Sequence, residues 1–181
     1  MKNNVVLIGM PGCGKSTVGV VLAKSLGYRF LDVDLLIQER EGKLLYEIIE
    51  ERGFEGFVKA EEEAILSIST EETIIATGGS AVYGASAMRH LCETGTVVYI
   101  KLSCRGIAER LGDLHQRGVV MRGKMTLMDL YEERTPLYER YAELVIDADG
   151  KELKDIVSEI KSQILCKSEK NTLQIVNKLL E

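Results

Sequence analysis

The sequence has no long apolar run and no clustered cysteines. No apolar stretch approaches the roughly 18 residues that a membrane-spanning helix needs, and residues 1–4 lead directly into a short strand, so we expect no signal peptide. The cysteines stand far apart without a C-x-x-C pair, as Cys13, Cys92, Cys104 and Cys166. This spacing favours free thiols in a reducing compartment over a disulfide framework or a zinc site. We therefore expect a cytoplasmic protein with no membrane association.

Positive charge is also scarce. The formal net charge is −5 at pH 7, whereas a surface that follows a nucleic-acid backbone needs an excess of basic residues. The balance argues against broad nucleic-acid binding. With 181 residues, of which 45% are hydrophobic and 28% charged, the chain has the composition of an ordinary globular protein and the length of one α/β domain.

A complete phosphate-binding loop is present near the N-terminus. Residues 9–17 read Gly-Met-Pro-Gly-Cys-Gly-Lys-Ser-Thr, which matches G-x-x-x-x-G-K-[ST], and they follow the apolar run at 5–8. Backbone N–H groups of such a loop converge on a phosphate at the positive end of the next helix. Lys15 can then reach the β- and γ-phosphates, and the Ser16 hydroxyl can bind Mg²⁺. A plain glycine-rich turn is the alternative, but the full match favours nucleoside triphosphate binding.

Strands and helices are expected to alternate along the chain. Continuous apolar runs predict strands, and apolar residues at helical spacing predict helices. The expected strands are 5–8, 28–33, 73–76, 96–102 and 144–147, and the expected helices are 15–26, 35–41, 44–52, 54–68, 85–93, 103–111, 126–141 and 151–165. Pro136 is expected to break the helix that contains it. The alternation predicts a parallel sheet covered by helices on both faces.

Two segments lie outside this alternation. Residues 112–124 lack a clean period and are expected to form a mobile loop. The tail after residue 166 has apolar residues at helical spacing, from Leu173 to Leu180. We interpret the tail as a surface helix folded on its own domain, and a docking or oligomer-forming helix is the alternative.

Two aspartates follow the second predicted strand. Asp32 and Asp34 stand at its carboxyl end, where open α/β sheets bind ligands, and a period of two would place both on the same side. Phosphoryl transfer needs one group that holds Mg²⁺ and another that orients or deprotonates the attacking hydroxyl. The alternative is that one aspartate only caps the next helix. Beside a phosphate-binding loop, we favour the catalytic interpretation.

Glycines and arginines form the remaining candidate groups. Gly78 and Gly79 follow the third predicted strand and permit a close approach between backbone and ligand, although a plain turn would use them too. Guanidinium groups clamp phosphates and carboxylates bidentately, and the candidates are Arg110, Arg117, Arg122 and Arg134. An arginine-bearing mobile loop near a phosphate-binding loop predicts a lid, with a surface charge run as the alternative for Arg122.

Taken together, four segments resemble the shikimate kinase family. They are GMPGCGKST at 9–17, FLDVDLLI at 30–37, ATGG at 76–79 and ERTPLY at 133–138, in that family's order and spacing over about residues 4–165. The resemblance implies an α/β, three-layer P-loop kinase fold, with a five-stranded parallel sheet in the order 2-3-1-4-5, flanking helices and a mobile lid. It implies one domain over residues 1–166, with a substrate-binding segment at about 32–62 and the lid at about 112–124, followed by the helical tail 167–181.

The resemblance also implies ATP and Mg²⁺ as cofactors and a role for individual residues. Asp34 would bind the substrate hydroxyls and act as the base, with Lys15 and Arg117 as further catalytic residues. Asp32 and Ser16 would hold the metal. The substrate would contact Asp34, Gly78, Gly79 and, through its carboxylate, Arg134. The nucleotide would contact Gly12, Cys13, Gly14, Lys15, Ser16, Thr17, Arg110 and Arg117, with Arg110 against the adenine.

The sequence departs from the family pattern in three places. Val58 follows Phe57 where the family usually has an arginine, the second clamp on the carboxylate of shikimate. Ser80 replaces a third glycine, and the lid reads Arg-Gly-Val-Val at 117–120 instead of Arg-Pro-Leu-Leu. Lys59 cannot simply substitute, because one residue along a helix turns the side chain by about 100°. The nucleotide half of the resemblance is intact, and the acceptor half is altered.

The favoured function is an ATP-dependent kinase that transfers the γ-phosphoryl group to a hydroxyl of a small carboxylate. Shikimate is the default acceptor, which would place the enzyme in aromatic amino-acid biosynthesis. The nearest alternative is the same chemistry on a hydroxy amino acid or a polyol, and a P-loop switch that drives a partner is a more distant one. We expect a monomer, with a tail-mediated dimer as the alternative.

Overall fold

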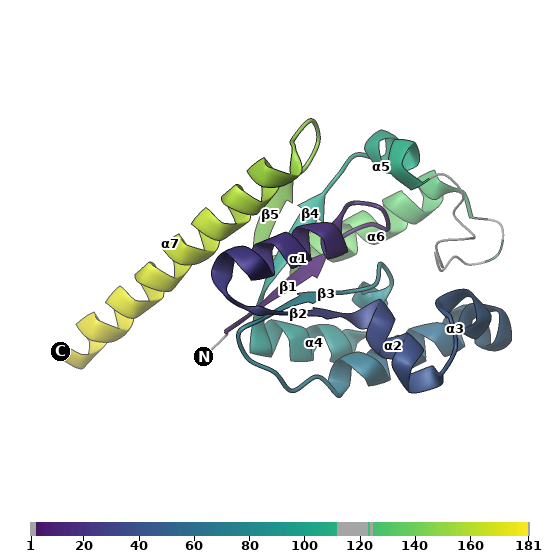
Figure 1. Ribbon diagram of the computed structural model, residues 1–181, viewed down its shortest axis with the longest axis horizontal. Helices are drawn as coiled ribbons and strands as arrows, with labels where there is room; N and C mark the ends of the chain where they lie inside the picture. Colours follow the sequence, from purple (N-terminus) through teal and green to yellow (C-terminus); the bar gives the residue numbers. More distant parts are fainter. Residues whose placement is uncertain (1–2, 112–122, 124, 181) are drawn as a thin grey trace.

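Five parallel strands form a single sheet at the centre of the molecule (Figure 1). A computed structural model describes residues 3–111, 123 and 125–180, with the backbone alone for residues 111 and 168–180. The strands are β1 (Asn4–Ile8), β2 (Arg29–Asp32), β3 (Thr73–Ala76), β4 (Gly95–Lys101) and β5 (Leu144–Asp147). Their order is β2-β3-β1-β4-β5, so the fold class and the strand order expected from the sequence are confirmed.

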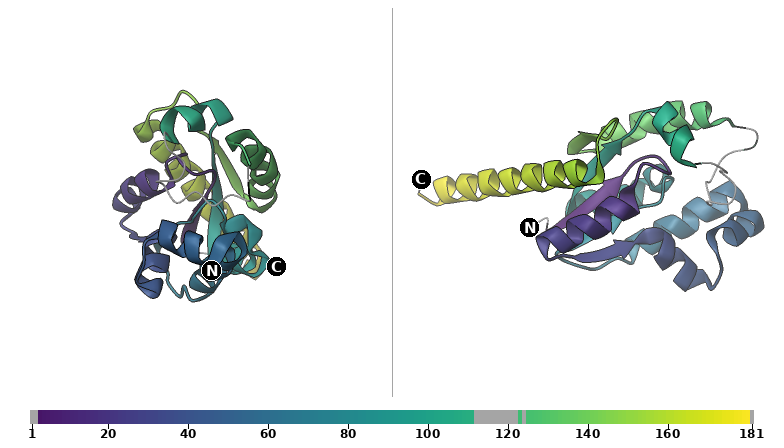
Figure 2. Two further views of the ribbon diagram at one scale, coloured as in Figure 1. Left: turned by 90° about the vertical axis from the view of Figure 1, so that its right-hand side faces the viewer. Right: turned by 45° about the horizontal axis from the view of Figure 1, so that its top comes forward.

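Helices cover both faces of this sheet (Figure 2). They are α1 (Lys15–Leu26), α2 (Val33–Glu41), α3 (Leu45–Leu66), α4 (Ala85–Thr94), α5 (Cys104–Leu111), α6 (Leu127–Tyr141) and α7 (Leu153–Leu180), with a short 3₁₀ helix η1 (Ala81–Tyr83). On one face α1 contacts α7, and on the other α4 and α6 contact β4. None of the helices in the described ranges is both long and apolar enough to cross a membrane.

The structure differs from the sequence-based expectation at several helix ends. Helix α2 begins at Val33, so Asp34 lies in its first turn and not on the strand. Gly53 interrupts α3 with φ 66° and ψ −173°, which agrees with the separate helices predicted at 44–52 and 54–68. The break expected at Pro136 is wrong, because α6 continues through it. Buried Leu130 and Tyr138 anchor that helix before and after the proline, so packing compensates for the one N–H that proline lacks.

The last helix combines two segments that were predicted separately, the helix at 151–165 and the tail after residue 166. Helix α7 runs without interruption from Leu153 to Leu180, and its C-terminal half extends past the sheet (Figures 1 and 2). Its first half contacts α1 and β5. The helical character predicted for the tail is therefore present, whereas its role stays a prediction. The predicted lid, residues 112–124, lies outside the described residues except for Gly123.

The core consists of the central strands and the helix faces that pack on them. Val6, Leu7 and Ile8 in β1 are completely buried, which explains why this strand is a continuous apolar run rather than an alternating one. Helix α1 packs closely on β2 because it carries Gly19 at the contact. A Cβ at that position would lie 2.6 Å from Cε2 of Phe30.

Asn4 ties together the amino ends of three strands. Its Nδ2 donates to the carbonyl oxygens of Thr70 at 2.8 Å and Thr94 at 3.2 Å, and its Oδ1 accepts from the backbone N–H of Thr73 at 3.1 Å. The residue is only 3% exposed. A single amide side chain thus satisfies backbone groups just before β3 and β4, which lie on either side of β1.

We therefore expect Asn4→Ala to destabilise the fold by at least about 2 kcal/mol, because buried backbone groups would lose their partners. Urea unfolding of the variant and of wild type measures the difference. Asn3→Ala, at the neighbouring and less buried position, is the control and should change stability by less than about 0.5 kcal/mol. An equally small effect at Asn4 would contradict this role.

Candidate active site

One cavity of about 550 Å³ lies at the carboxyl edge of the sheet. Its lining combines segments that are far apart in the sequence. They are Pro11–Val18, Asp34, Phe57, Thr77–Ser80, Arg110, Arg134, Lys151, Leu153 and Ile156. Every site residue predicted within the described ranges lines this cavity except Asp32, which is hydrogen-bonded to a lining residue. Arg117 lies outside the described residues.

The phosphate-binding loop connects β1 to α1. Gly12 and Gly14 adopt φ values of 79° and 106°, which residues with a Cβ rarely adopt. Gly14 is the N-cap of α1, so the first N–H groups of that helix face the loop and can bind an anion. Lys15 is 8% exposed, and its Nζ donates to the carbonyl oxygens of Gly9 at 2.9 Å and Met10 at 3.0 Å. The loop thus holds a largely desolvated positive charge.

Asp32 connects this loop to α2. Its Oδ2 accepts from the hydroxyl of Ser16 at 2.6 Å, and its Oδ1 accepts from the backbone N–H of Asp34 at 3.0 Å. Asp32 is therefore the helix cap that the sequence left as an alternative, and it also contacts the predicted metal-binding hydroxyl. The position of Asp34 follows from this cap, since the first turn of α2 carries it into the cavity.

Ser16 and Asp32 could serve as the few protein ligands that Mg²⁺ needs, but they do not form a site that surrounds a metal with protein ligands. Within the described residues, no group of three or more His, Cys, Asp or Glu side chains could hold a metal ion. Mg²⁺ usually takes only one or two protein ligands and completes its octahedron with waters and phosphate oxygens. A hydroxyl and a carboxylate 2.6 Å apart at the end of the phosphate-binding loop fit that pattern.

The pKa of the Asp34 carboxyl group is raised toward neutral pH. Its pKa is raised from 3.8 to about 6, chiefly by burial and then by the charge of Asp32, while Lys15 opposes the shift. A group with a pKa near the working pH is well suited to accept a proton.

Gly78 and Gly79 lie where no side chain would fit. A Cβ on Gly78 would approach Oε1 of Glu61 to 2.3 Å and Oδ1 of Asp34 to 2.8 Å. A Cβ on Gly79 would lie 2.8 Å from Cδ of Pro11 and 2.9 Å from Nη1 of Arg134. The turn therefore packs against Pro11 of the phosphate-binding loop on one side, and against the predicted acceptor residues Asp34 and Arg134 on its opposite side.

Glu61 is a buried carboxyl that the sequence analysis did not identify. It is 1% exposed, its Oε2 accepts from the hydroxyl of Ser80, and its Oε1 has no hydrogen-bond partner among the residues that the structure describes. Burial raises its pKa from 4.5 to about 7, with the charge of Asp34 acting in the same direction and Ser80 and Arg134 against it. An acidic residue four positions after Phe57, on the apolar stripe of a helix, was the available signal.

Arg134 brings a guanidinium group to the acceptor end of the cavity. It is 1% exposed and lies in α6. Its Nε donates to the hydroxyl of Tyr83 at 3.2 Å, and its Cζ lies 5.2 Å from the centre of that ring. Tyr138, one turn further along α6, donates to the carbonyl oxygen of Gly79 at 2.7 Å. Helix α6 thus holds both the arginine and the glycine turn beside it.

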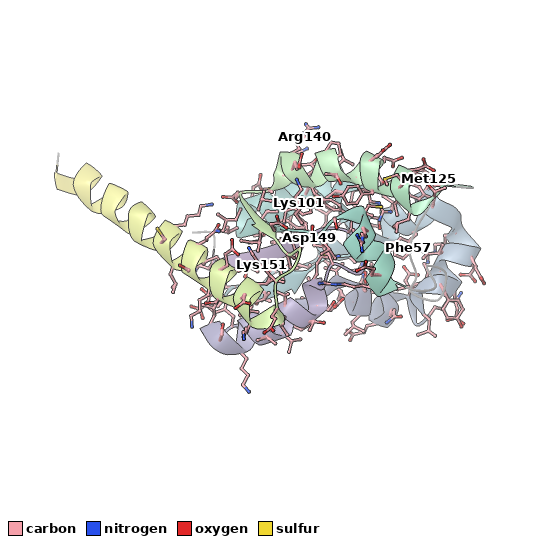
Figure 3. All side chains as sticks on the ribbon, turned by 90° about the horizontal axis from the view of Figure 1, so that it is seen from above. Phe57, Lys101, Met125, Arg140, Asp149 and Lys151 are labelled. Carbon is pink, nitrogen blue, oxygen red and sulfur yellow. The ribbon has the colours of Figure 1, made fainter. Side chains whose placement is uncertain are left out.

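The opposite end of the cavity lies between the phosphate-binding loop and the start of α7. Arg110 donates from Nη1 to the carbonyl oxygen of Cys13 at 3.3 Å. Lys151 also lines this end (Figure 3) and pairs with Glu159 at 2.5 Å. Asp149, in the loop after β5, accepts from the N–H of Ser103 at 2.8 Å and so connects that loop to the one after β4. Lys151 was predicted only as the start of a helix, because a single lysine carries no motif.

The altered position Val58 does not line the cavity, although its neighbour Phe57 does. Neither possible replacement for the missing cation lines it. Lys59 is exposed and lies 4.0 Å from Glu63, and Arg89 is exposed on α4. Among the described residues at the acceptor end, Arg134 is the guanidinium that reaches the cavity.

Comparison with known proteins gives consistent matches. The family model described as shikimate kinase matches residues 11–165. A shikimate kinase of Moorella thermoacetica is 37% identical over 166 residues, which cover 91% of this chain and 95% of that protein. The structure of a shikimate kinase from Acinetobacter baumannii in complex with shikimate has a TM-score of 0.84 and 31% identity, covering 91% of this chain and 93% of that one. Another, from Aquifex aeolicus, has a TM-score of 0.77 and 33% identity, with 94% and 98% covered.

The raised pKa of Glu61 predicts that folding stability depends on pH. Below pH 4.5 its carboxyl is protonated in both the folded and the unfolded chain. Between pH 4.5 and about 7 only the unfolded chain ionises, so folding stability falls as pH rises. Glu61→Gln removes this loss and should gain on wild type by roughly 3 kcal/mol between pH 4.5 and 8.

Urea unfolding at pH 5 and pH 8 checks this prediction. Glu63→Gln, on the exposed side of the same helix, is the control and should show the same difference from wild type at both values. A Glu61→Gln difference that does not change with pH would show that the carboxyl ionises normally.

Proposed function

The chain belongs to the shikimate kinase family, and on that premise we propose that it transfers the γ-phosphoryl group of ATP to a hydroxyl of shikimate. The observation that carries the proposal is that the phosphate-binding loop and the acceptor residues share one cavity and touch. Pro11 and Gly79 form the contact. A phosphoryl group held by the loop would therefore face an acceptor held between Asp34 and Arg134.

We assign the nucleotide to the loop and to the residues beyond it. The N–H groups at the start of α1 and the ammonium of Lys15 would bind the phosphates. Arg110 and Lys151, at the other end of the cavity, would border the adenosine. Ser16 and Asp32 would hold Mg²⁺, which when bound would bridge phosphate oxygens and neutralise their charge.

Asp34 would act as the base. Its carboxylate would accept the proton of the attacking hydroxyl, and Arg134 would hold the acceptor's carboxylate so that this hydroxyl faces the γ-phosphate. The charge that develops on the transferred group would be stabilised by Lys15. Arg117, outside the described residues, stays a prediction for the same role.

A second acceptor is a specific alternative. Val58 replaces the arginine that the family pattern places there, and Arg134 is the guanidinium found at the acceptor end of the described structure. A small hydroxy acid other than shikimate would use the same base and the same single clamp. We further propose a cytoplasmic monomer with its catalytic domain in residues 1–166, and the role of the tail stays a prediction.

The first test is ADP release with and without shikimate. Wild type should release ADP in a shikimate-dependent way, with kcat/KM rising as pH increases through about 6, because Asp34 must be ionised to accept a proton. Asp34→Asn should lower kcat at least about 100-fold and leave the KM for ATP almost unchanged.

Asp155→Asn, which also changes an aspartate in the first turn of a helix, is the matched control and should behave as wild type. ADP release that requires another hydroxy acid would change the acceptor, and release without any acceptor would favour a switch. A loss of less than threefold in Asp34→Asn would leave Asp34 with no part in proton transfer.

The second test concerns residue 58. A guanidinium at this position would add one charge-assisted pair to the acceptor's carboxylate, so Val58→Arg should lower the KM for shikimate about tenfold. Val58→Met is the control for side-chain length without charge. A wild-type KM in the micromolar range that Val58→Arg does not improve would show that the single clamp suffices.

A further inference from the structure

We propose that Tyr83 is a positioning residue for the acceptor's carboxylate, which it serves by fixing the guanidinium of Arg134, with Phe54 fixing Tyr83 in turn. The inference rests on the proposed function and names residues that the family resemblance does not supply. Arg134 lines the cavity, whereas Tyr83 is outside the lining as the structure describes it. Tyr83 would therefore act through the arginine and not on the acceptor itself.

The contact between Tyr83 and Arg134 fixes the guanidinium in two ways. Nε donates to the tyrosine hydroxyl at 3.2 Å, and the cationic carbon lies 5.2 Å from the ring centre. The hydrogen bond sets the direction of the planar group, and the ring attracts its charge. Because Tyr83 engages the Nε edge, a carboxylate in the cavity would approach the guanidinium from its Nη side, where Nη1 lies 2.9 Å from the position that a Cβ on Gly79 would take.

Tyr83 is itself held from two sides. Its hydroxyl donates to Glu133, the residue before Arg134 in α6. Its ring packs edge-on against Phe54, with centroids 5.4 Å apart and planes at 70°. The hydroxyl of Tyr83 thus donates its single proton to the glutamate and accepts a hydrogen bond from the arginine. Burial and the bond to Glu133 raise the pKa of Tyr83, so the hydroxyl keeps that proton at neutral pH.

This support matters because, within the described residues, Arg134 is the arginine at the acceptor end of the cavity. Phe54 and Val58 are four residues apart and so lie on the same side of α3. That side presents apolar groups where the family pattern would place a second cation. An arginine loses considerable side-chain freedom when it binds, and the loss is smaller when the group is already oriented. The aromatic pair would therefore compensate in orientation for the cation that Val58 replaces.

The experiment compares Tyr83→Phe with wild type in the full chain. Phenylalanine keeps the ring against Phe54 and removes the hydroxyl that Nε contacts. We expect the KM for shikimate to rise about fivefold, as loss of one hydrogen bond to a charged group implies, with kcat within about twofold and the KM for ATP unchanged. Tyr141→Phe is the matched control. Its ring lies 5.7 Å from the guanidinium carbon of Arg140 at the other end of α6, so all three constants should stay at wild-type values.

The methyl ester of shikimate separates positioning from a general structural role. It has no negative charge for Arg134 to hold, so Tyr83→Phe should leave its KM unchanged while raising that of shikimate. In an Arg134→Lys background, the same substitution should have almost no further effect, because lysine has no Nε–H to orient.

Each other outcome counts against the proposal. Equal increases in KM for both acceptors, or a lowered kcat with unchanged KM, would make Tyr83 a structural residue. An unchanged KM for shikimate would show that Arg134 needs no support. If wild type releases no ADP with shikimate, the proposed function fails and this inference with it. If wild type is active with shikimate and Tyr83→Phe behaves as wild type, this inference alone fails.

Discussion

The active site depends on β1 and β3 ending side by side. Thr77, the first residue after β3, donates to the carbonyl oxygen of Leu7 in β1 from its N–H at 3.2 Å and from its hydroxyl at 3.0 Å. The loops that follow the two strands therefore begin at the same level. Gly79 can then pack directly on Pro11 because it has no Cβ. Through this contact the sheet brings the phosphate-binding loop against the Gly78–Gly79 turn, which is the arrangement that the proposed transfer requires.

The charges at the acceptor end follow from burial. Two carboxyl groups, Asp34 and Glu61, approach the same glycine, and Lys15 and Arg134 are two of the cations that line the cavity there. Full ionisation of both acids would cancel the two positive charges. Burial prevents this below neutral pH, since it raises the pKa of Glu61 to about 7 and that of Asp34 to about 6. Between these values the site has a base and an excess of positive charge, which suits an anionic acceptor beside anionic phosphates.

The fold and the nucleotide end could be predicted because their signals are local in the sequence. Nine consecutive residues define the phosphate-binding loop, and continuous apolar runs mark the buried strands. Local rules failed where packing or capping decides the structure. Proline stays inside α6 because its neighbours are buried on both sides. Asp34 lies on a helix, since Asp32 caps α2 and the helix begins two residues earlier than the apolar pattern indicates. Lys151 reaches the cavity only through the path of its loop, on which the sequence has no motif.

The acceptor end was less predictable because α3, η1 and α6 each contribute to it. The motif around Arg134 indicated the arginine, but its partner Tyr83 lies 51 positions away and belongs to no motif. Nor does the pattern of α3 show that Phe54 meets that tyrosine. A motif records the group that touches a substrate, whereas the orientation of that group is set by contacts between residues far apart in the sequence. The valine at 58 therefore indicates a loss when it is considered alone. Phe54 lies one turn before Val58 on the same side of α3 and packs on Tyr83, which contacts Arg134, and the strength of a clamp depends on its orientation as well as on its charge.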